Sequence, residues 1–194
     1  MEPVTHTEQY LSETAEIASK IGPLHVEQMA EVLAGLVGES RLFIIGLGGS
    51  AANASHAASD FVNLCGINAI CLSDNIAEFT ATANDSGWDT AYATMLSRRS
   101  VGKTDALMVL SVGGGTNEVS RPLTSAMSYA KQTQMPILGI VGRDGGRVAR
   151  CAKHCVIVPT VEPSRVTPHT EGWQSVILHL LVSHPALQRT KTKW

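Results

Sequence analysis

The sequence lacks the features of several protein classes. It has no excess of positive charge, because fifteen lysines and arginines face seventeen aspartates and glutamates, for a net charge of -2. Nucleic-acid and anionic-membrane binding depend on clustered basic residues, so neither partner is expected. No apolar run approaches the roughly 20 residues that cross a bilayer. The acidic N-terminal stretch lacks the basic start and apolar block of a secretory signal, and we therefore expect a cytoplasmic protein.

Cysteine is also scarce. The four cysteines are scattered through apolar segments, at Cys65, Cys71, Cys151 and Cys155. This distribution is typical of buried thiols in a reducing compartment and excludes a disulfide framework as the basis of the fold.

What the sequence does contain is a regular alternation of patterns over 194 residues, enough for one well-buried domain. Apolar residues at helical spacing in 10–21 and 26–36 predict an N-terminal helix pair within residues 1–39. Residues 40–194 then alternate helical patterns with five short apolar runs, at 42–45, 67–72, 106–112, 137–141 and 156–158. Such runs between helices are typical of buried parallel strands. The prediction for residues 1–194 is a single α/β domain, a three-layer doubly wound five-stranded parallel sheet preceded by the helix pair.

Two glycine-rich turns follow predicted strands, at the sheet edge where such folds bind ligands. They are Gly46-Leu47-Gly48-Gly49-Ser50 and Ser111-Val112-Gly113-Gly114-Gly115-Thr116, each before a helical pattern. Glycines let the backbone approach an anion, and the N–H groups of a helix start attract it. Neither turn carries the lysine of an ATP-binding loop, which favours a sugar phosphate. The candidate phosphate and substrate contacts are Gly48, Gly49, Ser50, Asn53, Ser111, Gly113, Gly114 and Thr116.

Each turn also has a plainer interpretation. Ser50 is a good helix N-cap, and Thr116 is an alternative cap for the helical pattern that begins near Val119. The glycines would then serve only tight connections between strands and helices.

A metal site is a further possibility. His56 and Asp60 stand four residues apart on a predicted helix, which places both on one face. Glu171 and His179 share a face of a later helix, roughly 12 Å apart along its axis. Two imidazoles and two carboxylates suit zinc or a similar divalent ion. The alternatives are a surface His–Asp ion pair, a core histidine and a glutamate that favours its helix start.

Together these motifs resemble the sugar isomerase (SIS) domain family, and within it the phosphoheptose isomerases. The resemblance covers nearly the whole chain. It rests on the two glycine turns, the His56 and His179 helices, Asn84-Asp85-x-Gly87 and Gly142-x-Asp144-Gly145-Gly146. It implies a flavodoxin-like strand order and a homotetramer with active sites between subunits. It also implies zinc-dependent conversion of sedoheptulose 7-phosphate to D-glycero-D-manno-heptose 7-phosphate through a cis-enediol.

The resemblance implies residue roles as well. The family's zinc ligands fall on His56, Asp60, Glu171 and His179. For the proton transfers we expect Asp60 or Glu171 to move the carbon-bound proton and His179 to serve the oxygen protons. The family's phosphate contacts fall on Ser50, Ser111 and Thr116, and a substrate-contacting aspartate falls on Asp85.

The chain also departs from the family pattern. Asp60 replaces a glutamate, Glu171 replaces a glutamine, and Val112-Gly113 replaces hydroxyl residues. Two alternatives therefore remain: an isomerase of another ketose phosphate, such as an octulose phosphate, and a non-catalytic sugar-phosphate sensor or scaffold.

Overall fold

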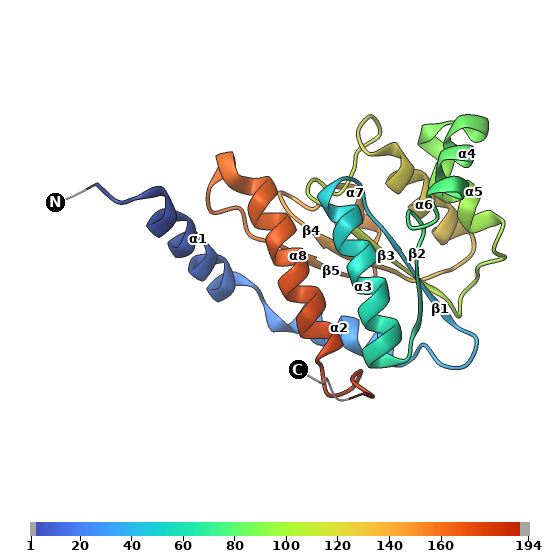
Figure 1. Ribbon diagram of the computed structural model, residues 1–194, viewed down its shortest axis with the longest axis horizontal. Helices are drawn as coiled ribbons and strands as arrows, with labels where there is room; N and C mark the ends of the chain where they lie inside the picture. The colour runs from blue at the N-terminus through green and yellow to red at the C-terminus, as the bar shows by residue number, and fades with distance from the viewer. Residues whose placement is uncertain (1–2, 191–194) are drawn as a thin grey trace.

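Five parallel strands form the central sheet of the computed structural model, which describes residues 3–190 (Figure 1). The strands are β1 (Arg41–Ile45), β2 (Asn68–Cys71), β3 (Ala106–Ser111), β4 (Ile137–Val141) and β5 (His154–Ile157). Their order is β2-β1-β3-β4-β5, the expected flavodoxin-like arrangement. The neighbours β1 and β3 carry chain crossovers in opposite directions, so the ligand crevice of such a sheet lies above their carboxyl ends.

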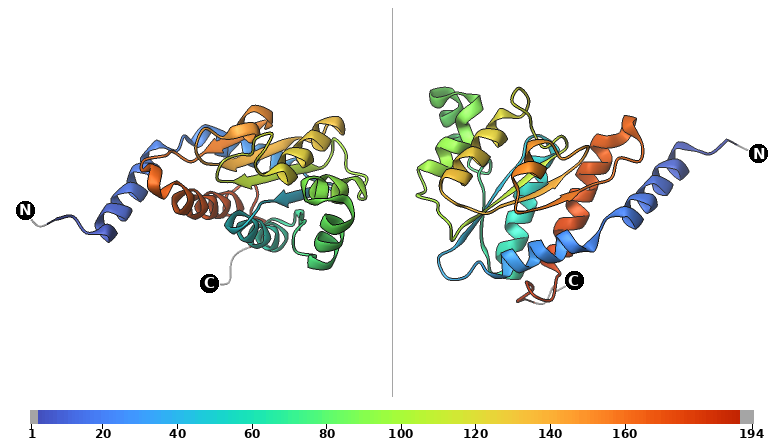
Figure 2. Two further views of the ribbon diagram at one scale, coloured as in Figure 1. Left: turned by 90° about the horizontal axis from the view of Figure 1, so that it is seen from above. Right: turned by 180° about the vertical axis from the view of Figure 1, so that it is seen from behind.

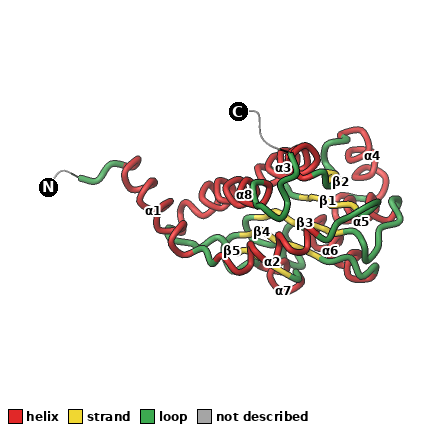
Figure 3. The backbone as a smooth tube through the Cα atoms, turned by 90° about the horizontal axis from the view of Figure 1, so that it is seen from below, coloured by secondary structure: helices red, strands yellow, loops and turns green. Residues whose placement is uncertain are grey.

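Helices cover both faces of the sheet, as Figures 2 and 3 show. One face packs against α2 (Pro23–Ala34), α3 (Gly49–Cys65) and α8 (Val166–Val182). The other packs against α5 (Ala91–Ser97), α6 (Arg121–Gln132) and α7 (Gly146–Cys151), with α4 (Ile76–Ser86) beside them. Two short 3-10 turns, Trp88–Thr90 and Pro163–Arg165, precede α5 and α8. Alternate strand residues face the two apolar layers. The central strands β1, β3 and β4 are buried on both sides, as their continuous apolar sequence predicts, whereas the edge strands β2 and β5 are only partly buried.

The first helix, α1 (His6–Lys20), projects away from the sheet (Figures 1 and 2). Thr5 and Glu8 form a capping box that satisfies free N–H groups at its start. Only Glu13 and Ile17 of this helix are buried. The predicted helix pair is therefore present, but most of α1 is left uncovered by the rest of residues 3–190.

Three local predictions are corrected by the structure. Ser50 is not an N-cap: the cap is Gly48, with φ at +60°, and Ser50 lies buried inside α3. Thr116 caps no helix, because α6 begins only at Arg121, after Ser120 in the left-handed conformation. The last strand begins at His154, two residues before the predicted start, and ends at Ile157.

The cysteines are all free. Cys65 and Cys71 are buried, and Cys151 and Cys155 are partly buried. Burial raises the pKa of Cys65 to about 11 and that of Cys155 to about 12, so both thiols stay protonated near neutral pH. Among the helices of residues 3–190, none combines the length and apolar character needed to span a membrane.

Candidate functional site

A pocket of about 320 Å³ lies above the carboxyl ends of β1, β3 and β4. Its polar lining is rich in hydroxyl groups. The lining residues are Leu47, Ser50, Ser111, Val112, Gly113, Gly115, Thr116, Val119, Ser120, Arg143 and Thr167. The two glycine-rich turns therefore converge on one pocket, as the sequence predicts. Hydroxyl donors beside the start of α3 suit an anion such as a phosphate.

The first turn is held in place from the opposite face of the sheet. The buried Tyr92 hydroxyl donates to the Gly46 carbonyl at 2.8 Å. Burial raises the pKa of Tyr92 to about 12, so this donor keeps its proton. A side chain at Gly46 would meet the Ser50 backbone at 2.4 Å, which explains the glycine.

The second turn interlocks with the 142–146 turn. The Arg147 N–H donates to the Gly115 carbonyl at 2.9 Å, and the Val148 N–H donates to the Gly114 carbonyl at 3.0 Å. Gly114 has φ at +67°, and a Cβ there would stand 1.9 Å from the Gly145 carbonyl oxygen. Gly114 does not line the pocket, and its part is to let the two turns meet.

Two hydroxyls of the second turn are oriented by the backbone. Ser111 Oγ accepts the Gly114 N–H at 3.0 Å. Thr116 Oγ1 accepts the N–H groups of Glu118 and Val119 at 3.1 and 3.0 Å. Because a hydroxyl also carries one donor, each O–H remains available to an anion in the pocket.

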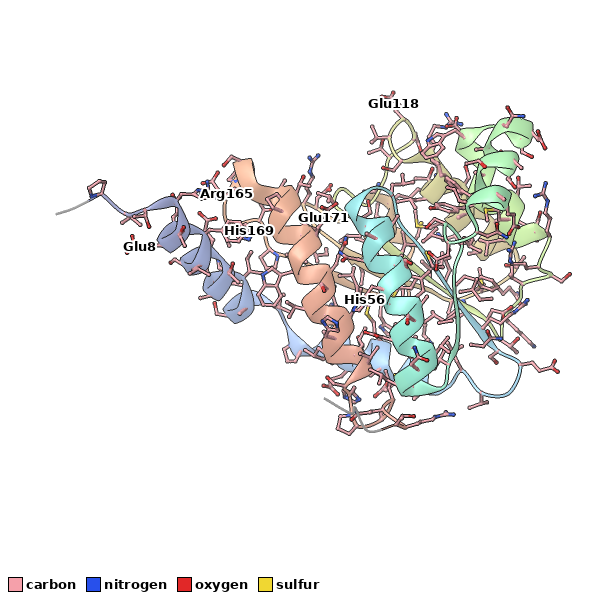
Figure 4. All side chains as sticks on the ribbon, in the orientation of Figure 1. Glu8, His56, Glu118, Arg165, His169 and Glu171 are labelled. Atoms are coloured by element: carbon pink, nitrogen blue, oxygen red, sulfur yellow. The ribbon has the colours of Figure 1, made fainter. Side chains whose placement is uncertain are left out.

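A second constellation lies between α3 and α8, which run side by side (Figure 4). His56 and Asp60 of α3 meet His179 of α8, and one ligand atom from each lies within 4.8 Å of the others. The two imidazole Nε2 atoms are 3.0 Å apart, and Asp60 Oδ2 lies 3.3 Å from His56 Nε2 and 3.7 Å from His179 Nε2.

These three side chains fit a divalent ion. Tetrahedral zinc with bonds of about 2.0–2.1 Å places its ligand atoms roughly 3.3 Å apart, close to the three separations found here. Imidazole nitrogen and carboxylate oxygen are donors that zinc accepts. The side chains of His56 and His179 are 54% and 55% exposed, so this His–Asp–His trio opens toward solvent in the single chain.

Glu171 stands apart from the trio. A Cβ built on Gly49 would lie 2.4 Å from Glu171 Oε2, so the carboxylate rests over the first residue of α3. Gly49 adjoins Ser50 of the pocket, whereas His179 lies two turns further along α8. Figure 4 shows Glu171 between α3 and α8. Along α8 it lies between Thr167, which lines the pocket, and His179 of the trio.

Four other predicted contacts lie outside the pocket lining, namely Gly48, Gly49, Asn53 and Asp85. Asn53 joins the helices, since its amide donates to the Glu171 carbonyl at 2.9 Å and to Gln174 Oε1 at 3.1 Å. Asp85 is exposed near the end of α4, where it accepts the Asn84 amide at 2.8 Å. In contrast, sequence reasoning missed Ser120, Arg143 and Thr167 as lining residues. Arg143 lies inside the Gly142–Gly146 motif. That motif was the sequence feature that could have identified it as a lining residue.

The start of α8 is anchored to α1. Glu13 accepts hydrogen bonds from Arg165 and lies 2.8 Å from His169 Nε2. Tyr10 stacks on His169, with ring centroids 4.4 Å apart. Hydrogen bonds from Arg165 and then His169 lower the pKa of Glu13 to about 2. Arg165 and His169 are both occupied by this contact.

Comparison with known proteins gives the family. The SIS-domain model matches residues 9–142. A phosphoheptose isomerase of Helicobacter pylori is 30% identical over 151 residues, 75% of this chain and 74% of the relative. One from Alteromonas mediterranea is 32% identical over 180 residues, 89% of this chain and 84% of the relative. Phosphoheptose isomerase GmhA from Neisseria gonorrhoeae superimposes with a TM-score of 0.76 and 26% identity, over 91% of this chain and 94% of that one.

The matched segment contains both glycine turns and two members of the trio, His56 and Asp60. The five-stranded order of the sheet and the pocket above β1 and β3 agree with the same assignment. The chain therefore belongs to the SIS-domain family and, within it, to the phosphoheptose isomerases.

Proposed function

We propose that this protein is an aldose–ketose isomerase that converts sedoheptulose 7-phosphate to D-glycero-D-manno-heptose 7-phosphate. One observation carries the proposal. A hydroxyl-rich pocket that suits an anion lies along the same α3–α8 pair as the His–Asp–His trio, which fits a divalent ion. The carboxylate of Glu171 lies between the pocket and the trio. Isomerisation of a phosphorylated sugar needs three groups, arranged in this order along the site. They are a binding site for its phosphate, a proton-transferring group, and an electrophile at its carbonyl.

The phosphate end supplies binding energy remote from the reacting carbons. Ser50, Ser111 and Thr116 donate hydroxyl hydrogens to the phosphate, and the backbone N–H groups at Gly48 and Gly49 add the positive end of α3. Binding energy gained there holds the carbonyl end in register with the proton-transferring group.

At the reacting end, His56, Asp60 and His179 are the residues that would hold zinc. When bound, the ion polarises the substrate carbonyl and its neighbouring hydroxyl, which lowers the cost of developing negative charge. A metal-bound side chain is a weaker base. Glu171, which is not a member of the trio, therefore acts as the base that removes the carbon-bound proton. Its carboxylate removes the proton from one carbon and returns it to the adjacent carbon of the cis-enediol.

The proposed enzyme is a homotetramer with active sites shared between subunits. Its proposed location is the cytoplasm. Three observations support the oligomer: the half-exposed histidines of the trio, the projecting α1, and exposed apolar side chains on α3 and α8, namely Val62, Val176 and Leu180. A second subunit laid on this face would cover the trio and exclude water from it. The free cysteines agree with a reducing compartment. The substrate contact assigned to Asp85 rests on its sequence motif alone.

The test is NMR of the zinc-loaded protein in D₂O with sedoheptulose 7-phosphate and, separately, an octulose phosphate. We expect deuterium at the carbon next to the carbonyl, the appearance of aldose, and loss of both in His179→Ala. Turnover of the octulose phosphate alone would keep the chemistry and change the substrate. Tight binding without exchange for either sugar would overturn the enzyme and leave a sensor or scaffold.

A further inference from the structure

Arg143 is the one charged side chain among the residues that line the pocket above β1, β3 and β4. Within residues 3–190 it forms no ion pair and no side-chain hydrogen bond. Most of the other arginines within residues 3–190 form ion pairs or side-chain hydrogen bonds. Carboxylates hold Arg41, Arg99, Arg121 and Arg165, and hydroxyls hold Arg98 and Arg147. An uncommitted guanidinium at the wall of an anion pocket points to a ligand that is itself an anion.

The backbone at Arg143 is strained. Its φ is +51°, a left-handed conformation that a long side chain rarely adopts. The surrounding turn enforces it. The Gly145 N–H donates to the Gly142 carbonyl at 2.9 Å, the Gly142 N–H donates to Val112 at 3.0 Å, and Asp144 accepts the Gly146 N–H at 3.2 Å. Strain of this kind persists where the surroundings over-determine it, which is common at ligand sites.

Glycine or asparagine is the ordinary residue for such a turn position. An arginine there costs folding free energy, so a turn function alone does not explain it. The exposed side chain lies at the pocket wall beside Gly113: a Cβ built on Gly113 would lie 3.9 Å from Arg143 Cδ. Because Gly113 carries no side chain, the space beside the guanidinium stem stays open.

We propose that Arg143 is the cationic anchor of the substrate phosphate and sets the preference of this pocket for a phosphate dianion. The inference deepens the proposed function, because it presumes that a sugar phosphate is the ligand. Val112 and Gly113 leave this side of the pocket without hydroxyls, and the planar guanidinium fork supplies paired donors that match phosphate oxygens. The hydroxyls of Ser111 and Thr116 complete the cradle from β3 and its turn.

The deciding variant is Arg143→Gly, because glycine removes the cation and also relieves the strained backbone. We expect its thermal midpoint to equal or exceed that of the wild type. The dissociation constant for inorganic phosphate, measured by calorimetry on the full chain, should rise roughly 10- to 100-fold, the loss of a charge-assisted contact. Arg143→Lys should retain part of the affinity as a point charge. Arg150→Ala, an exposed arginine on α7 outside the pocket, is the matched control and should leave the dissociation constant unchanged.

The outcomes separate this inference from the proposed function. Wild-type affinity for phosphate in Arg143→Gly, or no phosphate binding by the wild type, overturns the anchor even if the protein isomerises a ketose phosphate. Phosphate binding that depends on Arg143, without isomerisation of any ketose phosphate, supports the anchor and overturns the isomerase. In an active enzyme, Arg143→Gly should raise KM for the sugar phosphate much more than it lowers kcat.

Discussion

The side-chain amide of Asn53 donates a hydrogen bond to the main-chain carbonyl of Glu171 at 2.9 Å, which ties the first turns of α3 to the start of α8. The same amide donates to Gln174 Oε1 at 3.1 Å. These bonds fix the position of Glu171 along the axis of α3, and at that position its carboxylate lies against Gly49. The position of the proposed base therefore depends on the absence of a side chain at residue 49.

Gly49→Ala should displace Glu171 without unfolding the protein. The new Cβ would stand 2.4 Å from Glu171 Oε2, and the far end of a flexible side chain can move away from it. We expect turnover to fall at least about tenfold, because misplacing a catalytic group costs rate steeply. Zinc content should be unchanged, since the trio lies elsewhere. The measurements are steady-state kinetics, thermal melting and metal analysis of the purified variant.

Gly172→Ala is the matched control for this substitution. Gly172 is the next residue of α8 after Glu171, but it is exposed and a Cβ there meets nothing within 4 Å. Alanine should stabilise α8 by up to about 1 kcal/mol and leave turnover intact. Equal activity in both alanine variants would contradict the assigned role of Glu171.

Glu171→Gln and Asp60→Asn should separate proton transfer from metal binding. With glutamine at 171, kcat should fall by about 10²–10⁴, the usual contribution of a general base, while zinc affinity persists. With asparagine at 60, zinc affinity should fall more than about a hundredfold, because even outer-shell changes cost about 10–100-fold. Zinc titration and deuterium exchange on each variant provide the readouts. Loss of zinc from Glu171→Gln would instead make Glu171 a fourth ligand.

The site shows which parts of a structure the sequence predicts. His56 and Asp60 converge because four residues make about one helical turn, a local rule that sequence spacing contains. Their partner His179 lies 123 residues from His56. Helix spacing offered it as a candidate ligand, but only the family resemblance favoured its meeting His56 and Asp60. Which helix packs beside α3 depends on the order of the whole sheet, and no local pattern carries that information.

The 111–120 segment was predicted less well for a related reason. Apolar spacing from Val119 predicted a helix directly after the glycines, but Ser120 adopts the left-handed conformation and Pro122 lies in the first turn of α6. Arg143 was overlooked because its motif served only as a marker of the family resemblance. Its place over the pocket follows from a positive φ and from the interlocking of two turns distant in sequence, neither of which has a periodic signature.

The interlocked turns predict an asymmetry between adjacent glycines. Gly114→Ala places a Cβ against the Gly145 carbonyl and forces a left-handed alanine, so we expect at least about 2 kcal/mol of destabilisation. For a chain of this size that is a fall of roughly 4–8 °C in the thermal midpoint. Gly113→Ala has 3.9 Å to its nearest neighbour and should change stability by less than about 0.5 kcal/mol. Calorimetric melting of both variants tests the pair, and equal midpoints would contradict the interlock.

The anchor of α1 predicts a pH-dependent contribution to stability. The pKa of Glu13 is lowered to about 2 by Arg165 and His169, below the roughly 4.3 of an unfolded glutamate. A depressed carboxyl pKa stabilises the folded state at pH values above the unfolded pKa, and this contribution is lost as the pH falls through the folded pKa. Glu13→Gln should therefore be less stable than the wild type at pH 7, and the difference should shrink between about pH 4.3 and about pH 2.

Urea unfolding of both proteins across this pH range measures the difference. Glu16→Gln is the control, because Glu16 lies on the same helix in an exposed pair with Lys20. Such a pair contributes about 0–1 kcal/mol, so this variant should stay close to the wild type throughout. A Glu13→Gln deficit that remains constant down to pH 2 would mean that the carboxylate charge is not its source. Stacking of Tyr10, on α1, against His169 of α8 would then hold the helix, and the ion pair would be incidental to it.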